Sequence, residues 1–163
     1  MGNAMRKNVE GSSEELLQLV SFNIGGEEFG VDILKVQEIN RMVTVTAVPN
    51  SPSFVDGVIN LRGKVIPIID LRTRFGMHRK EHDKNTRIIV VELKGNVVGF
   101  VVDAVSEVLR IPRSVTEPPP TVVAGINADY ITAVGKLEDK LLILLDLEKV
   151  FSVEERSLLK EVV

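Results

Sequence analysis

The stretch Val58-Ile-Asn-Leu-Arg-Gly-Lys-Val-Ile-Pro-Ile-Ile-Asp-Leu-Arg-Thr-Arg-Phe75 decides the fold, because its pattern returns as Val134-Gly-Lys-Leu-Glu-Asp-Lys-Leu-Leu-Ile-Leu-Leu-Asp-Leu-Glu-Lys-Val-Phe151. In both copies an apolar run reaches a polar turn, a second apolar run follows, and Asp-Leu opens a stretch with helical spacing. Asp70 and Asp146 align without a gap. The sequence therefore predicts a duplicated structural unit.

A second pair of segments supports the duplication. Val36-Gln-Glu-Ile39 is similar to Val105-Ser-Glu-Val108, and each lies a few residues after a strand-like run that ends in aspartate, at Asp32 and Asp103. The register between these two segments slips by two residues, so they are the weaker of the two matches.

Composition limits both the compartment and the function. A chain of 163 residues can form one ordinary domain or two small subdomains. The absence of cysteine excludes disulfides, Cys-ligated zinc and a thiol nucleophile, and it fits a reducing compartment. A net charge of -3 and a single tyrosine without tryptophan leave neither a basic field nor stacking residues for nucleic acid. No apolar run approaches the ~20 residues of a membrane span, so we expect a cytoplasmic protein without direct membrane insertion.

Short Val/Ile-rich runs separated by Gly, Asn, Pro or charged turns are typical of β-sandwiches and barrels. We expect strands over 19–24, 29–32, 43–48, 58–61, 64–69, 87–93, 97–102, 105–111, 130–137 and 141–145. The segment 33–39 fits either one helical turn or a strand, and Pro67 suggests an edge strand or a bulge. Residues 76–86 are expected to form an exposed connection between halves, and 117–120 an extended loop. Residues 147–162 predict one or two short helices, with Ser152 as N-cap.

These elements give about ten strands in two similar sets, for which two small barrels side by side fit best. We expect a flexible N-terminal tail over 1–15 and a C-terminal helix over 152–163. Between them, 16–151 form a single domain of two intimately associated barrels, roughly 16–86 and 87–151, whose strands are free to cross over. The predicted class is all-β with short helices.

Few residues suggest catalysis. His78 and His82, beside Glu81 and Asp83, could bind a metal ion if they shared a helix, but flanking Gly76 and Asn85 favour a solvated loop. The glycines of 25–30 lack the Lys-Ser/Thr of a phosphate-binding loop and instead predict a hairpin.

Four aspartates, Asp32, Asp70, Asp103 and Asp146, each end a strand where a helical turn or bend begins. They could act as paired acids and bases, but capping of orphan backbone N–H groups explains them better. The lack of a catalytic constellation favours a binding module.

One difference between the copies points to a binding role. Asn60-Leu-Arg62-Gly63 of the first copy is replaced by Lys136-Leu-Glu138-Asp139 in the second, while the apolar positions match. An arginine at a hairpin tip is usually just solvated. The functional alternative is an anchor for a partner carboxylate or carbonyl, because the planar guanidinium bonds two acceptors at once.

At these residues the chain resembles the CheW-type chemotaxis coupling proteins. The resemblance runs from about residue 19 to 151 and preserves both the order and the spacing of the motifs. It is carried by Glu28-Phe-Gly-Val-Asp-Ile-Leu-Lys-Val-Gln-Glu-Ile39, Gly57-Val-Ile-Asn-Leu-Arg-Gly63, Ile66-Pro-Ile-Ile-Asp-Leu-Arg72 and Val98-Gly-Phe-Val-Val-Asp103.

The resemblance implies two SH3-like five-stranded barrels, no enzymatic activity and no cofactor or metal. It implies an adaptor that joins the cytoplasmic tips of methyl-accepting chemoreceptors to the regulatory domain of a chemotaxis histidine kinase, recruited to membrane-associated receptor arrays. The residues that it places at the receptor and kinase surfaces are Val36, Glu38, Ile39, Gly57, Asn60, Arg62, Gly99, Val105 and Val108. Core packing is the alternative role for the four residues Val36, Ile39, Val105 and Val108.

Two competing hypotheses remain at this stage. A fragment of the kinase itself would share the fold, although the start, tail and terminal helix of this chain favour a free-standing coupler. A small β-barrel hydrolase or metal-dependent enzyme would use His78, His82 and neighbouring acids, and stoichiometric zinc or manganese in purified protein would support it.

Overall fold

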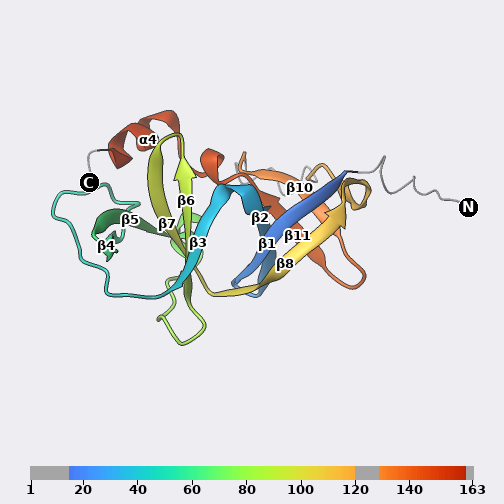
Figure 1. The fold of residues 1–163 in the computed structure, drawn as a ribbon, viewed down its shortest axis with the longest axis horizontal. Helices are drawn as coiled ribbons and strands as arrows, with labels where there is room; N and C mark the ends of the chain where they lie inside the picture. The colour runs from blue at the N-terminus through green and yellow to red at the C-terminus, as the bar shows by residue number, and fades with distance from the viewer. Residues whose placement is uncertain (1–14, 120–128, 161–163) are drawn as a thin grey trace, which may run out of the picture.

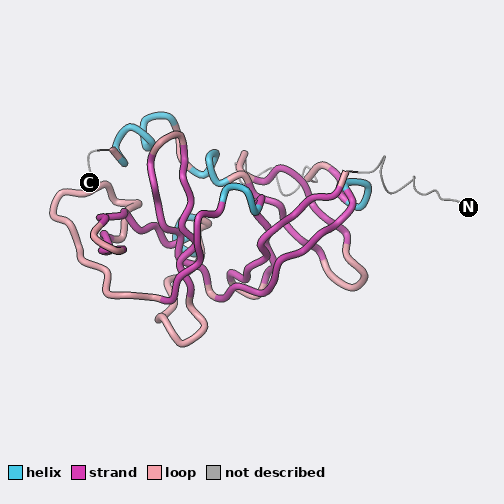
Figure 2. The backbone as a smooth tube through the Cα atoms, in the orientation of Figure 1, coloured by secondary structure: helices cyan, strands magenta, loops and turns pink. Residues whose placement is uncertain are grey.

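A computed structural model describes residues 15–119 and 129–160, and in this part of the chain two curved β-sheets lie side by side (Figures 1 and 2). The strands are β1 (Leu16–Ile24), β2 (Glu27–Asp32), β3 (Val36–Arg41), β4 (Gly57–Leu61), β5 (Lys64–Asp70), β6 (Arg87–Leu93), β7 (Asn96–Val102), β8 (Ala104–Pro112), β9 (Thr116–Glu117), β10 (Ile131–Lys136) and β11 (Leu141–Leu145). The 3₁₀ helices are η1 (Ile33–Lys35), η2 (Arg113–Val115) and η3 (Leu147–Val150), and the α-helices are α2 (Leu71–Arg74) and α4 (Val153–Leu159). The all-β class with short helices is confirmed.

The two copies of the repeat exchange strands. One sheet has the order β3-β6-β7-β5-β4, which we call barrel 1, and the other has the order β8-β1-β2-β11-β10-β9, which we call barrel 2. Each barrel thus takes the first hairpin of one copy and the later strands of the other copy. In both, a parallel pairing joins the exchanged hairpin to the rest, β5 with β7 in barrel 1 and β11 with β2 in barrel 2.

This exchange changes how the chain divides. The rough boundary expected between 86 and 87 falls inside barrel 1, because β6 and β7 pair with β3 and β5. The chain passes between barrels at η1, after β2, and again at Asp103, between β7 and β8. The segment 76–86 is an exposed loop that joins the two copies of the repeat, as expected, but it does not join the two barrels, since β5 and β6 belong to the same sheet.

The weaker sequence match corresponds to equivalent strands. In β3 the register against β6 shifts between Val36 and Glu38. In β8 the partner of Val105 is Phe22 and the partner of Glu107 is Ser21, with a shift at the same place. Both copies therefore carry a β-bulge at the same position. The two-residue slip arises because η1 precedes β3, whereas only Ala104 separates Asp103 from Val105.

Three apolar clusters form the core, one inside each barrel and one between the barrels. Ile59, Ile66, Ile68, Ile88, Val90 and Val101 fill barrel 1. Leu19, Ile111, Leu142 and Leu144 fill barrel 2. The largest cluster joins residues of both barrels, and all six phenylalanines and the tyrosine of the chain belong to it or pack against it. Because β6 and β7 are covered on both faces, their runs are continuously apolar instead of alternating.

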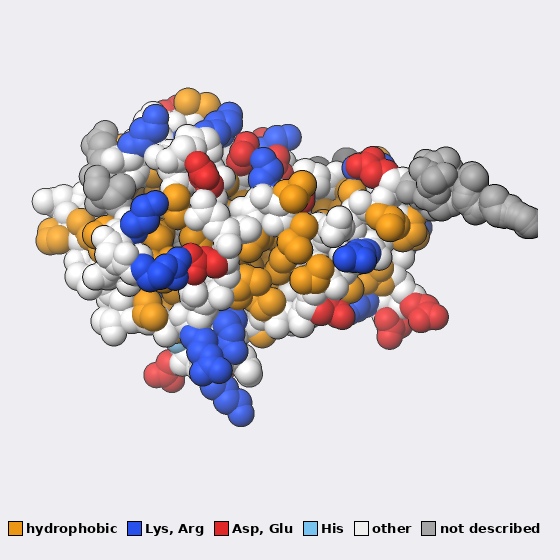
Figure 3. All heavy atoms as spheres, viewed as in Figure 1, with side chains coloured by type: hydrophobic (Ala, Val, Ile, Leu, Met, Phe, Trp, Pro, Cys, Tyr) orange, Lys and Arg blue, Asp and Glu red, His pale blue; other side chains and the backbone are white. Residues whose placement is uncertain are grey.

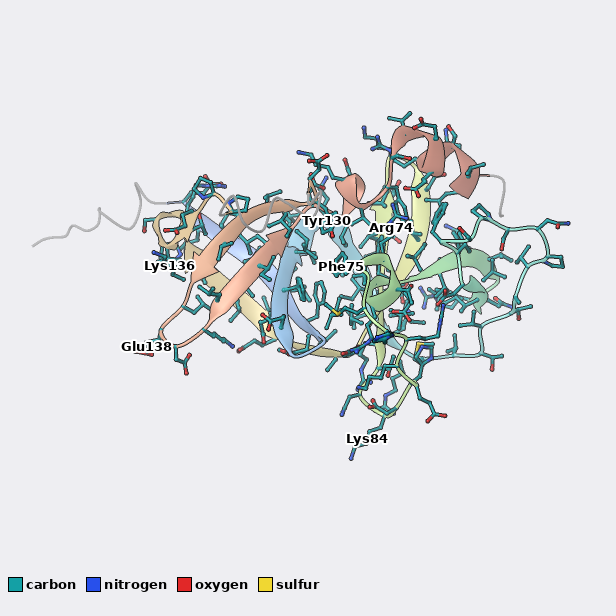
Figure 4. The ribbon with its side chains drawn as sticks, turned by 180° about the vertical axis from the view of Figure 1, so that it is seen from behind. Arg74, Phe75, Lys84, Tyr130, Lys136 and Glu138 are labelled. Carbon is teal, nitrogen blue, oxygen red and sulfur yellow. The ribbon has the colours of Figure 1, made fainter. Side chains whose placement is uncertain are left out.

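The aromatic side chains of this shared cluster pack against one another in pairs. The ring centroids of Phe75 and Tyr130 are 5.0 Å apart, those of Phe29 and Phe75 are 5.6 Å apart, and those of Phe54 and Phe151 are 5.4 Å apart. Seen from behind, Phe75 and Tyr130 lie between the barrels (Figure 4). The inter-barrel contact is therefore a packed core and not a loose domain interface.

Most expected strands are present, with two corrections. The strand expected over 43–48 is wrong, because in this segment only Thr46 forms a bridge, with Val58. The expectation that Pro67 marks an edge or a bulge is also wrong, since β5 lies between β7 and β4. Pro67 is tolerated there because the opposite residue, Val58, exchanges its backbone hydrogen bonds with Thr46, at 2.8 Å each.

Side-chain caps begin the helical turns as expected at three of the four aspartates. Asp32, Asp70 and Asp146 each accept a hydrogen bond from the backbone N–H two residues later, at 2.9, 2.9 and 3.0 Å. Asp103 is the exception, because its carboxylate bonds to Gly25 and Arg72 instead of capping a helix. Ser152 is confirmed as the N-cap of α4, where it forms a capping box with Glu155. None of the described helices is long and apolar enough to cross a membrane.

Candidate functional site

The edge strands β3 and β8 carry four apolar residues on the side that faces the other barrel. Val36 and Ile39 lie opposite Val91 and Ile89, and both partners belong to the inter-barrel cluster. On β8, Val105 and Val108 lie opposite Phe22 and Val20, which belong to the same cluster. Since residues directly opposite across a strand pair share one face of the sheet, all four lie on the inter-barrel side. We call Val36, Ile39, Val105 and Val108 the β3/β8 face.

Two of these four residues are partly buried, and the other two are exposed. Val36 and Val105 are partly buried and pack against the inter-barrel cluster, so these two residues contribute to the core, as the alternative role for them predicted. Ile39 and Val108 are 38% and 55% exposed and occupy equivalent positions of the two copies. Hydrophobic side chains gather over the middle of this side of the molecule, where β3, β1 and β8 lie (Figure 3). This surface can accept an apolar ridge from a partner.

One exposed apolar residue was missed by the sequence interpretation. Leu34 lies on η1, directly before β3, and is 88% exposed. It lines an open hollow of about 350 Å³ at one end of barrel 2, together with Leu16, Leu17 and Arg113. Leu34 is the second residue of η1, a turn that follows the capping Asp32 and has no buried residue.

Beside this face, an ion pair connects the two edge strands of barrel 1. The guanidinium of Arg62, at the tip of the β4–β5 hairpin, bonds to the carboxylate of Glu38 on β3. Asn40 donates a second hydrogen bond to Glu38, with Nδ2 and Oε1 3.1 Å apart. Because β3 and β4 are the outer strands of the sheet, this contact joins the hairpin tip after β4 to the strand at the opposite edge of the sheet. Both donors lower the pKa of Glu38 below its ordinary value, with the Arg62 bond the largest cause.

The backbone of the hairpin holds Arg62 outward. Arg62 and Gly63 have φ angles of 52° and 86°, the left-handed pair of a two-residue hairpin turn. Asn60 stabilises this turn by accepting a hydrogen bond from the N–H of Gly63 at 2.8 Å. The side chain of Arg62 stays 68% exposed, so the guanidinium can contact a partner while it touches Glu38. Asn60 and Arg62 are thus on one exposed tip.

Two of the nine residues implied by the resemblance are not on a surface. Gly57 is buried, and a Cβ there would lie 2.4 Å from the carbonyl oxygen of Thr46. Gly99 is buried inside barrel 1, where a Cβ would lie 2.7 Å from Ile68 and 2.8 Å from Ile88. Both glycines allow close approach within the barrel, so neither is exposed for direct contact with a partner.

The alternative histidine site gains no support from the geometry. His78 and His82 lie in the irregular loop between α2 and β6, as the flanking glycine and asparagine indicated, and do not share a helical face. Figure 4 shows this loop projecting from the body, with Lys84 at its end. Within residues 15–119 and 129–160, no three His, Asp or Glu side chains are grouped for metal binding.

Comparison with known proteins places these features in a family. A CheW-like domain model matches residues 18–155. The chain is 43% identical to chemotaxis protein CheW of Klebsiella aerogenes, over 89% of this chain and 87% of that protein. It is 37% identical to chemotaxis protein CheW of Rhizobium meliloti, over 96% of this chain and 99% of that protein. The crystal structure of scaffolding protein TtCheW from Thermoanaerobacter tengcongensis superimposes with a TM-score of 0.77 at 40% identity, covering 85% of this chain and 94% of that one.

Proposed function

This chain belongs to the CheW-like family of non-catalytic chemotaxis scaffold proteins, and on that premise we propose which of its surfaces hold its partners. The β3/β8 face receives the cytoplasmic tip of a chemoreceptor, and the β4–β5 hairpin tip contacts the regulatory domain of a histidine kinase. The chain is thereby recruited to membrane-associated receptor arrays. The observation that carries the proposal is the pair of exposed residues Ile39 and Val108 on the inter-barrel side of equivalent edge strands.

The shape and chemistry of the β3/β8 face suit a helical partner. Two apolar walls, one from each barrel, present branched side chains to a ridge laid between them. A helix supplies such a ridge through residues three and four positions apart. A helical receptor hairpin therefore fits the apolar side chains of this face, whereas an extended peptide would bind the backbone edge of β3 or β8 and leave those side chains uncovered.

The hairpin tip suits a different kind of partner. Arg62 combines full charge, a fork of donors and exposure, and these features favour binding to a carboxylate or a backbone carbonyl of a folded domain. Because Arg62 also bonds to Glu38, and Glu38 lies between Val36 and Ile39 in β3, the two surfaces are adjacent. A scaffold of this kind transmits signals by holding its partners in fixed relative positions, so that small receptor movements reach the kinase.

The test is co-sedimentation with receptor-containing membranes, with and without a chemotaxis histidine kinase, while kinase autophosphorylation is scored in the same samples. Ile39→Asp and Val108→Asp place a charge on the β3/β8 face without opening the core. Val153→Asp is the matched control, because Val153 is also an exposed apolar residue, at 67%, on the distant helix α4.

We expect the wild type and Val153→Asp to bind membranes and to raise kinase activity only when receptors are present. The two variants of the face should lose membrane binding and activation while remaining folded. Unchanged sedimentation of both face variants would exclude the β3/β8 face as the receptor site. Failure of the wild type to bind either partner would refute the coupling function itself.

A further inference from the structure

We propose that Arg72 and Asp103 are positioning residues that fix the angle between the two barrels and so set the spacing of the two walls of the β3/β8 face. The inference about the angle concerns the isolated chain, whereas its consequence for partners rests on the proposed function. Neither residue lies on the β3/β8 face, so they act through the strands that they hold.

Asp103 is the centre of a charged junction at the link from β7 to β8. Its Oδ2 atom accepts a hydrogen bond from Arg72 Nη1 at 2.5 Å and another from the backbone N–H of Gly25 at 2.9 Å. Its own backbone N–H donates to the carbonyl of Asn23 at 3.0 Å. Arg72 is held from a further side, because its Nε donates to the carbonyl of His78 at 3.0 Å. The two charged side chains are enclosed, at 19% and 16% exposure.

This junction ties together elements of both barrels. Arg72 belongs to α2, which follows β5 of barrel 1, while Gly25 is in the turn between β1 and β2 of barrel 2. The apolar cluster between the barrels provides most of the attraction, but hydrophobic contact has little directionality. Charged hydrogen bonds are short and directional, and they become stronger away from water. The cluster keeps the barrels together, and the Asp103 junction fixes how they are turned.

The equivalent junction in the other copy is weaker. Asp32 and Glu148 occupy the positions of Asp103 and Arg72, and as two anions they cannot pair. Glu148 instead bonds to Lys35 of η1 at 3.2 Å, and the Lys35 side chain is 51% exposed. Exposed pairs of this kind contribute little because water and salt screen them. The inter-barrel angle is therefore held at the Asp103 link and not at the η1 link.

The consequence falls on the walls of the β3/β8 face. β8, which carries Val105 and Val108, begins directly after Asp103, and β3, which carries Val36 and Ile39, begins directly after η1. Loss of the Asp103 junction frees the link that leads into β8, so that the two walls vary in separation. The other charged contact of α2, from Arg74 to Val150 and Glu155, lies beyond β11 and holds neither link. Two walls of variable separation bind a rigid partner less tightly, since binding must then select one arrangement.

The absence of cysteine from the chain allows a direct test. Cysteines placed at Arg41 and Arg110, exposed residues at equivalent positions of β3 and β8, carry spin labels whose distance distribution is measured by pulsed electron spin resonance. The test variants are Arg72→Met and the double variant Arg72→Met with Asp103→Asn. The double variant leaves no unpaired buried charge and keeps an acceptor for Gly25, so it remains folded if the single variant does not. Lys35→Met at the other link is the matched control.

We expect the distance distribution to broaden clearly in both Arg72 variants and to stay at wild-type width in Lys35→Met. An unchanged distribution in the folded double variant overturns the proposal, as does equal broadening in Lys35→Met. In the sedimentation assay, the double variant should bind receptor roughly three- to tenfold less tightly than the wild type. A variant outside the junction with the same melting temperature should keep the receptor affinity of the wild type. Because the spin-label measurement needs no partner, its outcome is independent of whether the coupling function holds.

Discussion

The hairpins β4–β5 and β10–β11 descend from one repeated unit, yet opposite charge patterns surround their tips. In barrel 1, Arg62 pairs with Glu38 across the closing edges of the sheet. In barrel 2 the equivalent residues are Glu138 and Glu107, two anions that cannot pair. There Lys136 bonds to Glu117 of β9 instead, at 3.1 Å, and Lys136 and Glu138 lie at the far end of the barrel from Phe75 and Tyr130 (Figure 4).

Their apolar residues show the opposite behaviour. The buried residues of the first copy match buried residues of the second copy position by position. The matched pairs are Ile66 with Leu142, Ile68 with Leu144, Ile69 with Leu145, Leu71 with Leu147. The fold therefore needs this pattern in both copies, whereas the charges at the hairpin tips and links are free to differ. Function is to be sought where the copies differ, so the predictions below change one copy against its equivalent in the other or change an element that only one copy has.

The largest effect is expected for Gly57→Ala, compared with Ala133→Gly at the equivalent position. An added Cβ at residue 57 meets the Thr46 carbonyl at 2.4 Å, and this carbonyl is fixed by its bond to Val58. We expect Gly57→Ala to lower the free energy of unfolding by about 2–3 kcal/mol through overpacking. Ala133→Gly should cost only about 0.5–1 kcal/mol, from backbone entropy. Urea denaturation measures both, and equal losses would show that the close crossing at Gly57 is not rigid.

A smaller effect, on binding and not on stability, is expected for Arg62→Ala against Glu138→Ala. Arg62 is exposed, so its removal should change the free energy of unfolding by less than about 0.5 kcal/mol. Loss of a charged hydrogen bond to a partner should weaken binding about tenfold, which titration with the kinase regulatory domain measures. Glu138→Ala should bind as the wild type does. Equal binding by Arg62→Ala would instead assign Arg62 to closure of the barrel alone.

Much of this architecture could be predicted because it depends on residues that are close together in the sequence. The duplication, most strands, three aspartate caps and the Ser152 cap follow from apolar spacing and from residues two or three positions apart. Crossing of strands between the barrels was allowed for, but which hairpins exchange could not be predicted, since the parallel pairings of β5 with β7 and β11 with β2 join distant segments. The expectation of a strand over 43–48 was wrong because alternating apolar and polar residues indicate a face that can be buried, but they do not indicate that another strand lies beside the segment.

The site was predictable only where the sequence indicates exposure. The hairpin tip could be recognised from the sequence as a turn whose charge differs between the two copies, and the side chain of Arg62 is exposed there. Gly57 and Gly99 were misassigned because a glycine required for close packing and a glycine required at an interface look identical in sequence. Asp103 was misassigned as a cap because its partner, Arg72, is distant in sequence and reaches it only through the exchanged strands.

The helix α4 follows the second copy only, and its N-terminus gives the next comparison. Ser152 accepts a hydrogen bond from the N–H of Glu155 at 3.1 Å, and the Glu155 side chain bonds back to Ser152 and to Arg74. Ser152→Ala should cost about 1 kcal/mol of stability, because a backbone donor loses its partner. The buried Leu159 couples α4 to the inter-barrel cluster, so thermal unfolding should report the loss. No change would mean that α4 melts before the barrels do.

The smallest effect, and one of opposite sign, is expected for Asp70→Asn against Asp146→Asn. Asp70 is 2% exposed, and burial is the largest cause that raises its pKa, with nearby Asp56 adding to the effect. Its folded state therefore favours the protonated carboxyl, so the stabilisation from Asp70 is present at acidic pH and is lost as pH rises through the raised pKa. Asparagine at position 70 still accepts the N–H of Arg72 and carries no charge.

We expect Asp70→Asn to raise the free energy of unfolding by up to about 1 kcal/mol near neutral pH. The gain should shrink as urea denaturation is repeated down to about pH 4, where the wild-type carboxyl is itself protonated in part. Asp146→Asn is the matched control, and because Asp146 is only half-buried its replacement should change the free energy of unfolding by less. A loss of stability in Asp70→Asn at neutral pH would mean that Arg79, whose Nη1 lies 3.8 Å from Asp70, compensates the buried charge fully.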